Sequence, residues 1–245
     1  MKILFMLPAA KGIYADEAEN RRISVIQSYA TPTIQIDIVN MPGVSGFSPW
    51  GQKQPDSYKS AGIIRAHELG AECALQAESD GYDAFCPFGL IDIGVQEARR
   101  RGVGIPVIGA AESSALICGM LGRRFARCFY LKSEEIEDQA RDRVIPWGLQ
   151  DLFVGTTAIG IPNSEYPHRR KEVLSRFVSC ANEAREMGAE VMGMIGMSIC
   201  PIEFSSKELS QACGMPVIDG IAAQMSMAEF WNVSGLPGSL MKIPR

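Results

Sequence analysis

Two glycine-containing loops carry the residues of this chain that are best suited to chemistry. The first loop covers residues 87–92 and the second covers residues 193–200, and each ends a short apolar run that is typical of a buried strand. Glycine lets a backbone approach a ligand closely, and backbone N–H groups stabilise a carboxylate or an enolate oxygen. The sequence therefore predicts a pocket for a small anion. The residues expected to contact the substrate are Pro8, Phe88, Gly89, Leu90, Ser113, Met194, Ile195, Gly196 and Ser198.

Three side chains in or near these loops could move a proton. Cys200 stands before Pro201 in the second loop and is either a reactive thiol or a small buried residue. Asp92 follows the first loop and is either an acid or base or the cap of a helix. Glu112 lies at an expected helix start, where the helix dipole alone would explain a carboxylate. Cys200, Asp92 and Glu112 are the predicted catalytic residues.

Further side chains have two explanations each. The hydroxyls of Ser113 and Ser198 could bind a substrate carboxylate, and they are equally good local caps of the backbone. Tyr14, Phe47 and Trp50 fall in long segments that follow early strands. They could form a lid with an aromatic wall, because loops of that length often carry function. Ordinary packing is the slightly favoured interpretation.

Short apolar runs and longer amphipathic stretches alternate along the chain and position these loops. Strands are expected at residues 2–7, 34–39, 83–88, 107–108, 125–131, 190–195 and 217–218. Helices are expected at residues 57–79, 94–101, 112–121, 134–143, 164–187, 205–213 and 222–231. Such alternation is typical of a mostly parallel sheet with helices on its faces and right-handed crossovers. The predicted fold class is therefore α/β.

The two halves of the chain repeat one plan. The segments that start near Asp83 and Glu190 each contain a strand, a glycine turn, a helix, a Pro-Val-Ile strand entry and another helix. Any α/β protein can show a similar order of elements by chance. The shared Pro-Val-Ile with a glycine on each side nevertheless favours a true duplication. We therefore expect two similar parallel-sheet lobes related by pseudo-twofold symmetry. Their equivalent loops would face each other across an active-site cleft.

Composition limits the classes of function. The 245 residues carry a net charge of −4 and only short basic clusters, which argues against a nucleic-acid partner. No apolar run reaches the ~18–20 residues that span a bilayer, and the apolar start is better explained by a strand than by a signal peptide. Seven cysteines without a Cys-x-x-Cys pair indicate a reducing, cytoplasmic location without disulfides. His67 and His168 are the only histidines, so no metal site is expected. Neither histidine is predicted to be catalytic.

Three motifs resemble the aspartate/glutamate/hydantoin racemase superfamily, in its hydantoin and allantoin racemase branch. GIPVIGAAESS at residues 104–114 resembles the family's strand and helix start. GMIGMS at residues 193–198 resembles its G-C-[AT]-G-M-[AS], and MPVIDGIAA at residues 215–223 resembles its PV-[IV]-DG-[VI]-AA. The resemblance covers nearly the whole chain, and the order of elements matches the duplicated family fold.

The resemblance implies a mechanism that this chain does not fully match. Family members racemise with two cysteines, one of which removes the α-proton while the other returns a proton on the opposite face. The first cysteine position falls on Gly89, or on Pro87 in another match. The second falls on Met194, or near Ile199 when it is counted back from Pro216. None of these residues has a thiol, so both catalytic cysteines are expected to be replaced.

The resemblance also gives the expected organisation and function. The C-terminal segment returns to the first lobe, so the lobes cover residues 1–115 plus 217–245 and residues 116–216. The expected protein is a cofactor-independent homo-oligomer that acts on a small carboxylate or cyclic amide through an enolate-like intermediate. A racemase or isomerase is the family default. The missing thiols leave two alternatives open: a decarboxylase, lyase or hydrolase that uses the same pocket, or a non-catalytic binding protein.

Overall fold

The computed structural model describes residues 1–13, 15–43, 61–131 and 134–241. Tyr14, Phe47 and Trp50, for which a lid or ordinary packing was considered, lie outside these ranges. The chain divides into two compact units, Met1–Ala110 with Gln224–Arg245 and Ala111–Ala223. The lobe boundaries expected from the sequence, at residues 115 and 217, stay a prediction.

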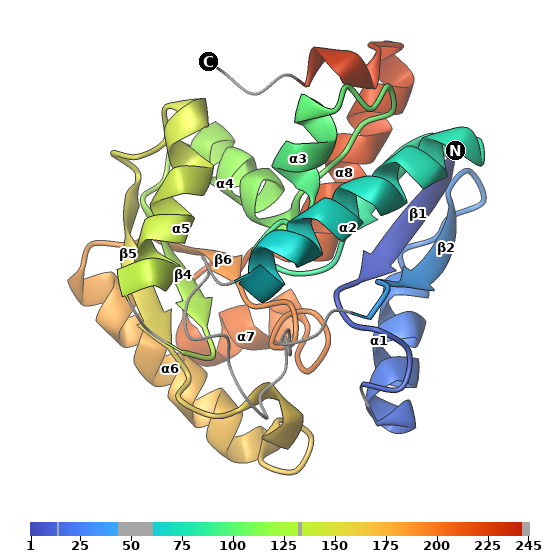
Figure 1. The fold of residues 1–245 in the computed structure, drawn as a ribbon. Helices are drawn as coiled ribbons and strands as arrows, with labels where there is room; N and C mark the ends of the chain where they lie inside the picture. The colour runs from blue at the N-terminus through green and yellow to red at the C-terminus, as the bar shows by residue number, and fades with distance from the viewer. Residues whose placement is uncertain (14, 44–60, 132–133, 242–245) are drawn as a thin grey trace. The chain divides into compact units, whose positions relative to one another are not determined.

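The first unit is built on a parallel sheet of three strands (Figure 1). The strands are β1 (Lys2–Leu7), β2 (Gln35–Asn40) and β3 (Ala84–Pro87), in the order β2-β1-β3. The helices between them and after them are α1 (Asp16–Gln27), α2 (Ala61–Ser79) and α3 (Val95–Arg100). Met6 pairs with Pro87 and Leu7 pairs with Asn40. The carboxyl ends of all three strands therefore lie at one edge of this sheet.

The second unit has a sheet of the same kind (Figure 1). Its strands are β4 (Phe125–Phe129), β5 (Phe153–Ala158) and β6 (Val191–Ile195), in the order β5-β4-β6. Its helices are α5 (Glu134–Val144), α6 (Arg170–Glu186) and α7 (Ser206–Cys213). Two further helices, α4 (Ala110–Leu121) and α8 (Gly220–Ser234), contain the points at which the chain passes from one unit to the other.

The two sheets share one topology. Each places the first strand of its unit in the centre, and all strand pairs are parallel. A single bridge then adds Val107 beside Phe85 in the first unit and Val217 beside Met192 in the second. The expected α/β class with two similar parallel sheets is confirmed. The strands expected at residues 107–108 and 217–218 are reduced to these bridges.

Two elements were not expected from the sequence. Helix α1 has a mostly polar sequence and buries only Arg22 and Ile26, so its apolar stripe is too narrow to be recognised. Strand β5 contains two threonines and Gly155, whose φ is +143°. The helix expected at residues 164–187 begins later, at Arg170, after a 3₁₀ turn at Asn163–Glu165.

Each unit has its own apolar core. Strand β4 alternates as a strand must, and its Ala126 and Cys128 belong to a buried cluster with Phe177 and Cys180 of α6. The neighbouring Phe125 contacts Phe153 of β5, with 5.8 Å between the ring centroids. In the first unit, β1 and β3 pack against the alanine-rich side of α2 in a second cluster. Both sheets are therefore held by packed side chains of their own unit.

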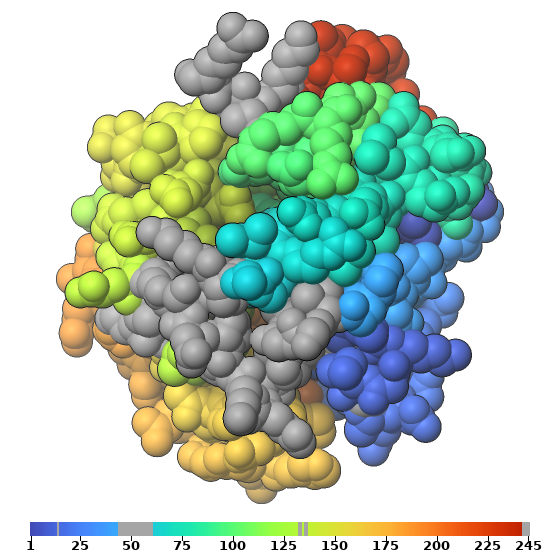
Figure 2. Space-filling view, in the orientation of Figure 1, coloured from blue at the N-terminus to red at the C-terminus, as the bar shows by residue number. Residues whose placement is uncertain are grey.

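Helices α2 and α3 pack through two glycines. Gly94 precedes α3 with φ +79°, and a Cβ atom on it would lie only 2.5 Å from the backbone carbon of Gly70. The Gly94 N–H donates to Nδ1 of His67 at 3.1 Å. The two helices lie side by side on the face that Figure 2 shows. Gly94 therefore holds the loop after β3 against helix α2.

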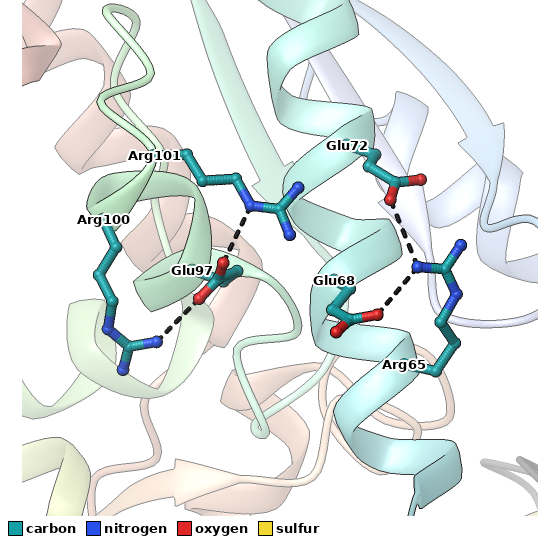
Figure 3. Close-up of polar contacts among 6 residues, drawn as sticks. All are labelled: Arg65, Glu68, Glu72, Glu97, Arg100 and Arg101. Carbon is teal, nitrogen blue, oxygen red and sulfur yellow. Dashed lines mark hydrogen bonds and ion pairs between the residues drawn. The ribbon is translucent and has the colours of Figure 1, made fainter.

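Ion pairs also line the exposed faces of these two helices (Figure 3). Along α2, Arg65 pairs with Glu68 and Glu72. On α3 and at its end, Glu97 lies between Arg100 and Arg101. Exposed pairs of this kind contribute about 0–1 kcal/mol each, so the glycine contact sets the packing. Among the helices of the described ranges, none is both long enough and apolar enough to cross a bilayer.

Candidate active site

The first predicted loop lies at the carboxyl end of β3, beside the end of β1. The Phe88 N–H donates to the Met6 carbonyl at 2.9 Å, which brings the loop to the sheet edge where Pro8 follows β1. The side chains of Phe88 and Leu90 are 0% and 1% exposed, so they belong to the core. Gly89 between them has φ +111°, and a Cβ atom on it would meet no atom of the described residues within 4 Å. The loop therefore offers backbone and open space at Gly89.

Asp92 is held at the end of this loop. It is 1% exposed and adopts a positive φ of 47°. Its N–H donates to the Gly89 carbonyl at 3.3 Å, and its own carbonyl accepts from the Val95 N–H at 3.1 Å. The carboxylate lies against Gly109, because a Cβ atom there would be 2.4 Å from its Cγ. The structure thus places a buried carboxylate directly before the start of α4.

Glu112 and Ser113 lie in the first turn of α4. Their exposed fractions are 6% and 1%, and the neighbouring Ser114 is fully buried. Three polar side chains are thus buried at the start of a helix whose other residues are mostly apolar. Buried polar groups are normally hydrogen-bonded, so these side chains are expected to hold fixed orientations. Glu112 and Ser113 remain candidates for catalysis and for substrate binding.

The glycines of the second predicted loop have structural roles that the sequence did not reveal. We expected Gly193 to let the backbone approach a ligand, but a Cβ atom there would lie 2.5 Å from Cys118 Sγ of α4. Gly193 therefore makes room for a helix. The Gly196 N–H donates to the Cys128 carbonyl at 2.8 Å. The helix expected at residues 205–213 is α7, which begins at Ser206.

Ser198 is the residue of the second loop that best fits a ligand contact. Met194 and Ile195 are 0% and 1% exposed within β6, so their side chains belong to the core. Ser198 is 5% exposed, and its hydroxyl has no hydrogen-bond partner within the described ranges. A buried hydroxyl without a partner costs about 1–3 kcal/mol. A ligand or a water molecule that bonds to Ser198 would recover this energy.

Cys200 lies inside the core of the second unit. Its side chain is fully buried, in the cluster that contains Phe177 of α6 and Leu209 of α7. Burial, with a smaller contribution from the negative charge of Asp219, raises the pKa of the Cys200 thiol well above its usual value. The thiol therefore stays protonated near neutral pH. It could donate a proton, but it is a poor base.

Gln224 of α8 was missed by sequence reasoning. Its Nε2 donates to the Pro87 carbonyl at 3.0 Å and to the Ile108 carbonyl at 2.8 Å, and its side chain is fully buried in the first unit. The only available signal was one amide in the largely apolar stretch Ile221–Ala228. No local pattern tells which distant carbonyls such an amide will reach.

The buried thiols make the protein sensitive to alkali. Burial raises the pKa of Cys118 to about 12 and also raises the pKa of Cys86 and Cys200. These thiols stay protonated in the folded state, whereas they ionise in the unfolded chain above about pH 8.5. The contribution of these thiols to the free energy of unfolding is therefore constant below that pH and falls above it, by up to about 1.4 kcal/mol per pH unit for each thiol.

Urea unfolding between about pH 7 and about pH 10 checks this expectation. Cys118→Ala removes one of the thiols and should give a shallower loss of stability with pH than the parent protein. Equal slopes for the two proteins would show that the Cys118 thiol does not contribute.

Within the described ranges, no three His, Cys, Asp or Glu side chains gather closely enough to hold a metal ion.

Comparison with known proteins gives a consistent family and fold. The family described as Asp/Glu/Hydantoin racemase matches residues 48–228. The hydantoin racemase of Pseudomonas sp. (strain NS671) is 33% identical over 157 residues, which are 63% of this chain and only 60% of that relative. Allantoin racemase from Klebsiella pneumoniae has a similar fold, with a TM-score of 0.74 at 21% identity over 98% of this chain and 91% of that one. Arylmalonate decarboxylase has a TM-score of 0.57 at 15% identity, over 96% and 94%.

Proposed function

The chain belongs to the Asp/Glu/hydantoin racemase family, and from this premise we propose that it is a cofactor-independent enzyme acting on a small carboxylate or cyclic amide. The reaction passes through an enolate-like intermediate. Racemisation or isomerisation is the default within the family. The similar proteins named as hydantoin and allantoin racemases make cyclic amides and their ring-opened ureido relatives the first substrates to test.

The open space at Gly89 is the observation that carries this proposal. Ligands of open α/β sheets bind beyond the carboxyl ends of the strands. Gly89 lies there, and within the described part of the chain no atom comes within 4 Å of the place of its Cβ. Backbone N–H groups of this loop, together with the Ser113 and Ser198 hydroxyls, are the proposed donors to the substrate anion. Asp92, Glu112 and Cys200 are the proposed acids and bases.

A second candidate is decarboxylation, which suits a chain in which both family cysteines are expected to be replaced. Racemisation needs one base and one acid, whereas decarboxylation needs a single proton donor. The bond between the α-carbon and the carboxylate breaks, CO₂ leaves, and the electron pair stays on the enolate. The Cys200 thiol then gives its proton to the α-carbon, and water returns a proton to the sulfur. A thiol whose pKa is raised by burial is present in the protonated form that this step requires.

A two-stage experiment separates these functions. The protein is first heated with hydantoins, dicarboxylates and cyclic imides, because a bound ligand raises the Tm. Each compound that stabilises the protein is then incubated in D₂O while deuterium at the α-carbon, CO₂ release and ring opening are followed. We expect deuterium incorporation with loss of optical rotation for a racemase, and CO₂ release for a decarboxylase. Binding without any turnover would instead show a non-catalytic binding protein.

Cys200→Ser tests the proton donor. If the thiol supplies the proton, turnover should fall by about 10²-fold, since a positioned acid contributes 10²–10⁴-fold. Cys213→Ser is the matched control, because Cys213 lies in the same buried cluster and is 7% exposed. Turnover that is equal in Cys200→Ser and Cys213→Ser, measured below the Tm of both, would remove Cys200 from the mechanism.

A further inference from the structure

Gln224 occupies the place where two strand-like segments of the first unit end. Its Nε2 donates to the carbonyls of Pro87 and Ile108, at 3.0 and 2.8 Å. Both neighbours are acceptors, so the nitrogen and not the oxygen of the amide must face them. The Oε1 atom is buried and has no hydrogen-bond partner within the described ranges. The amide therefore acts through its two donor hydrogens.

These two carbonyls lie just past the end of regular pairing. Phe85 bonds on both sides of Val107, with its N–H to the Pro106 carbonyl and its carbonyl to the Ile108 N–H. The next rung would need an N–H of residue 87 to bond the Ile108 carbonyl, and Pro87 has none. Gln224 thus takes the place of the next rung and joins the two backbones.

Each carbonyl also precedes a part of the proposed site. Pro87 comes immediately before the loop that contains Gly89 and Asp92. Ile108 comes immediately before Gly109, on which the Asp92 carboxylate packs. One side chain therefore fixes both backbones that meet at Asp92.

We propose that Gln224 is a positioning residue of the active site, which holds the Gly89 loop and the start of α4 at a fixed separation through its two hydrogen bonds to Pro87 and Ile108. The expected effect of Gln224 on turnover rests on the proposed function. The expected effect of Gln224 on the mobility of the Gly89 loop is independent of that function.

Two variants remove the donors in different ways. Gln224→Met keeps the length of the side chain and supplies no donor. Gln224→Glu supplies one O–H donor when it is protonated, at about pH 5, and none at about pH 8, where a carboxylate would face two carbonyl oxygens. Met225→Ala is the matched control. Met225 is the next residue of α8 and is 6% exposed, so its truncation opens a buried space while both hydrogen bonds of Gln224 stay in place.

Backbone hydrogen exchange, measured well below the Tm, gives a readout that needs no substrate. For Gln224→Met we expect faster exchange confined to residues 88–93 and 109–113. For Gln224→Glu we expect the same change at the higher pH and its partial reversal at the lower pH, where one of the two hydrogen bonds can form again. Met225→Ala should spread a smaller change along α8. The same pattern in Gln224→Met and Met225→Ala would overturn the proposal, as would a Gln224→Glu pattern that does not respond to pH.

Turnover gives the second readout. With a substrate found by the panel above, Gln224→Met should lower kcat by about tenfold or more at a nearly unchanged KM, since misplaced groups slow the chemical step more than they weaken binding. A parallel loss of kcat in Met225→Ala would show a general structural effect and overturn the positioning role. If the parent protein converts no compound, the proposed function fails, and hydrogen exchange still decides the role of Gln224.

Discussion

Gly94→Ala is expected to lower the free energy of unfolding by about 2–4 kcal/mol, the sum of about 1 kcal/mol for a positive φ and about 1–3 kcal/mol for overpacking. The new Cβ atom would lie 2.5 Å from the backbone carbon of Gly70 and 2.7 Å from the backbone nitrogen of Ala71. Helix backbones cannot move aside as a side chain can, so α2 and α3 must separate. This separation would also break the hydrogen bond from Gly94 to His67.

Substitutions at two other glycines serve as controls that separate the cost of the close contact from the cost of the positive φ. Gly81 and Gly102 have the same φ of +79°, and among the residues that the structure describes none would come within 4 Å of a Cβ atom on either. Gly81→Ala and Gly102→Ala should therefore cost only about 1 kcal/mol each. Urea unfolding of the three variants gives the comparison. If Gly94→Ala cost no more than these two controls, the close contact between α2 and α3 would be disproved.

The fold could be predicted from the sequence wherever apolar residues are continuous. The strands near residues 2–7, 125–131 and 190–195 were recognised because each is a short apolar run. Helix α1 and strand β5 were missed because their sequences are polar or contain glycine, and they become ordered through contacts with neighbouring elements. The shared topology of the two sheets was foreseen from the Pro-Val-Ile repeat, whose two copies became single bridges.

The site could be predicted only as a set of loops. Sequence position placed Gly89 and Ser198 after strands, but it could not show that Gly193 accommodates Cys118. Nor could it show that Gln224 reaches Pro87, because those residues are 137 positions apart. The protonation of Cys200 follows from the core that surrounds it, which is a property of the fold as a whole. Residue type and spacing therefore indicate where chemistry can occur, while packing decides which side chains take part.

Gly109→Ala is expected to displace the Asp92 carboxylate. The new Cβ atom would lie 2.4 Å from Asp92 Cγ and 2.5 and 2.7 Å from the carboxylate oxygens. Because Asp92 is 1% exposed, its carboxylate cannot swing into solvent. We expect a loss of about 2 kcal/mol of stability from overpacking. If Asp92 serves the reaction, we also expect turnover to fall by about 10²-fold, because a small misplacement of a reacting group has an effect of that size.

Gly104→Ala is the matched control, because its Cβ atom would also meet a carboxylate oxygen at 2.4 Å, that of Glu78. Glu78 is exposed and can move into water, which breaks only its hydrogen bond from the Gly104 N–H, so this substitution should lower stability by about 1 kcal/mol or less. Asp92→Gly suits the positive φ at that position and removes the carboxylate. In the Asp92→Gly background, Gly109→Ala should be nearly neutral, which would give a coupling of about 1–2 kcal/mol in a double-mutant cycle.

Asp92→Asn then separates the role of the carboxylate in packing from its role in proton transfer. The amide has nearly the same shape and tolerates the same backbone conformation, so it should pack against Gly109 as the carboxylate does. If the charge takes part in proton transfer, Asp92→Asn should lose turnover as fully as Gly109→Ala while losing less stability. Full turnover in Asp92→Asn together with strong coupling between Asp92 and Gly109 would make Asp92 an anchor of the loop and leave proton transfer to Glu112 or Cys200.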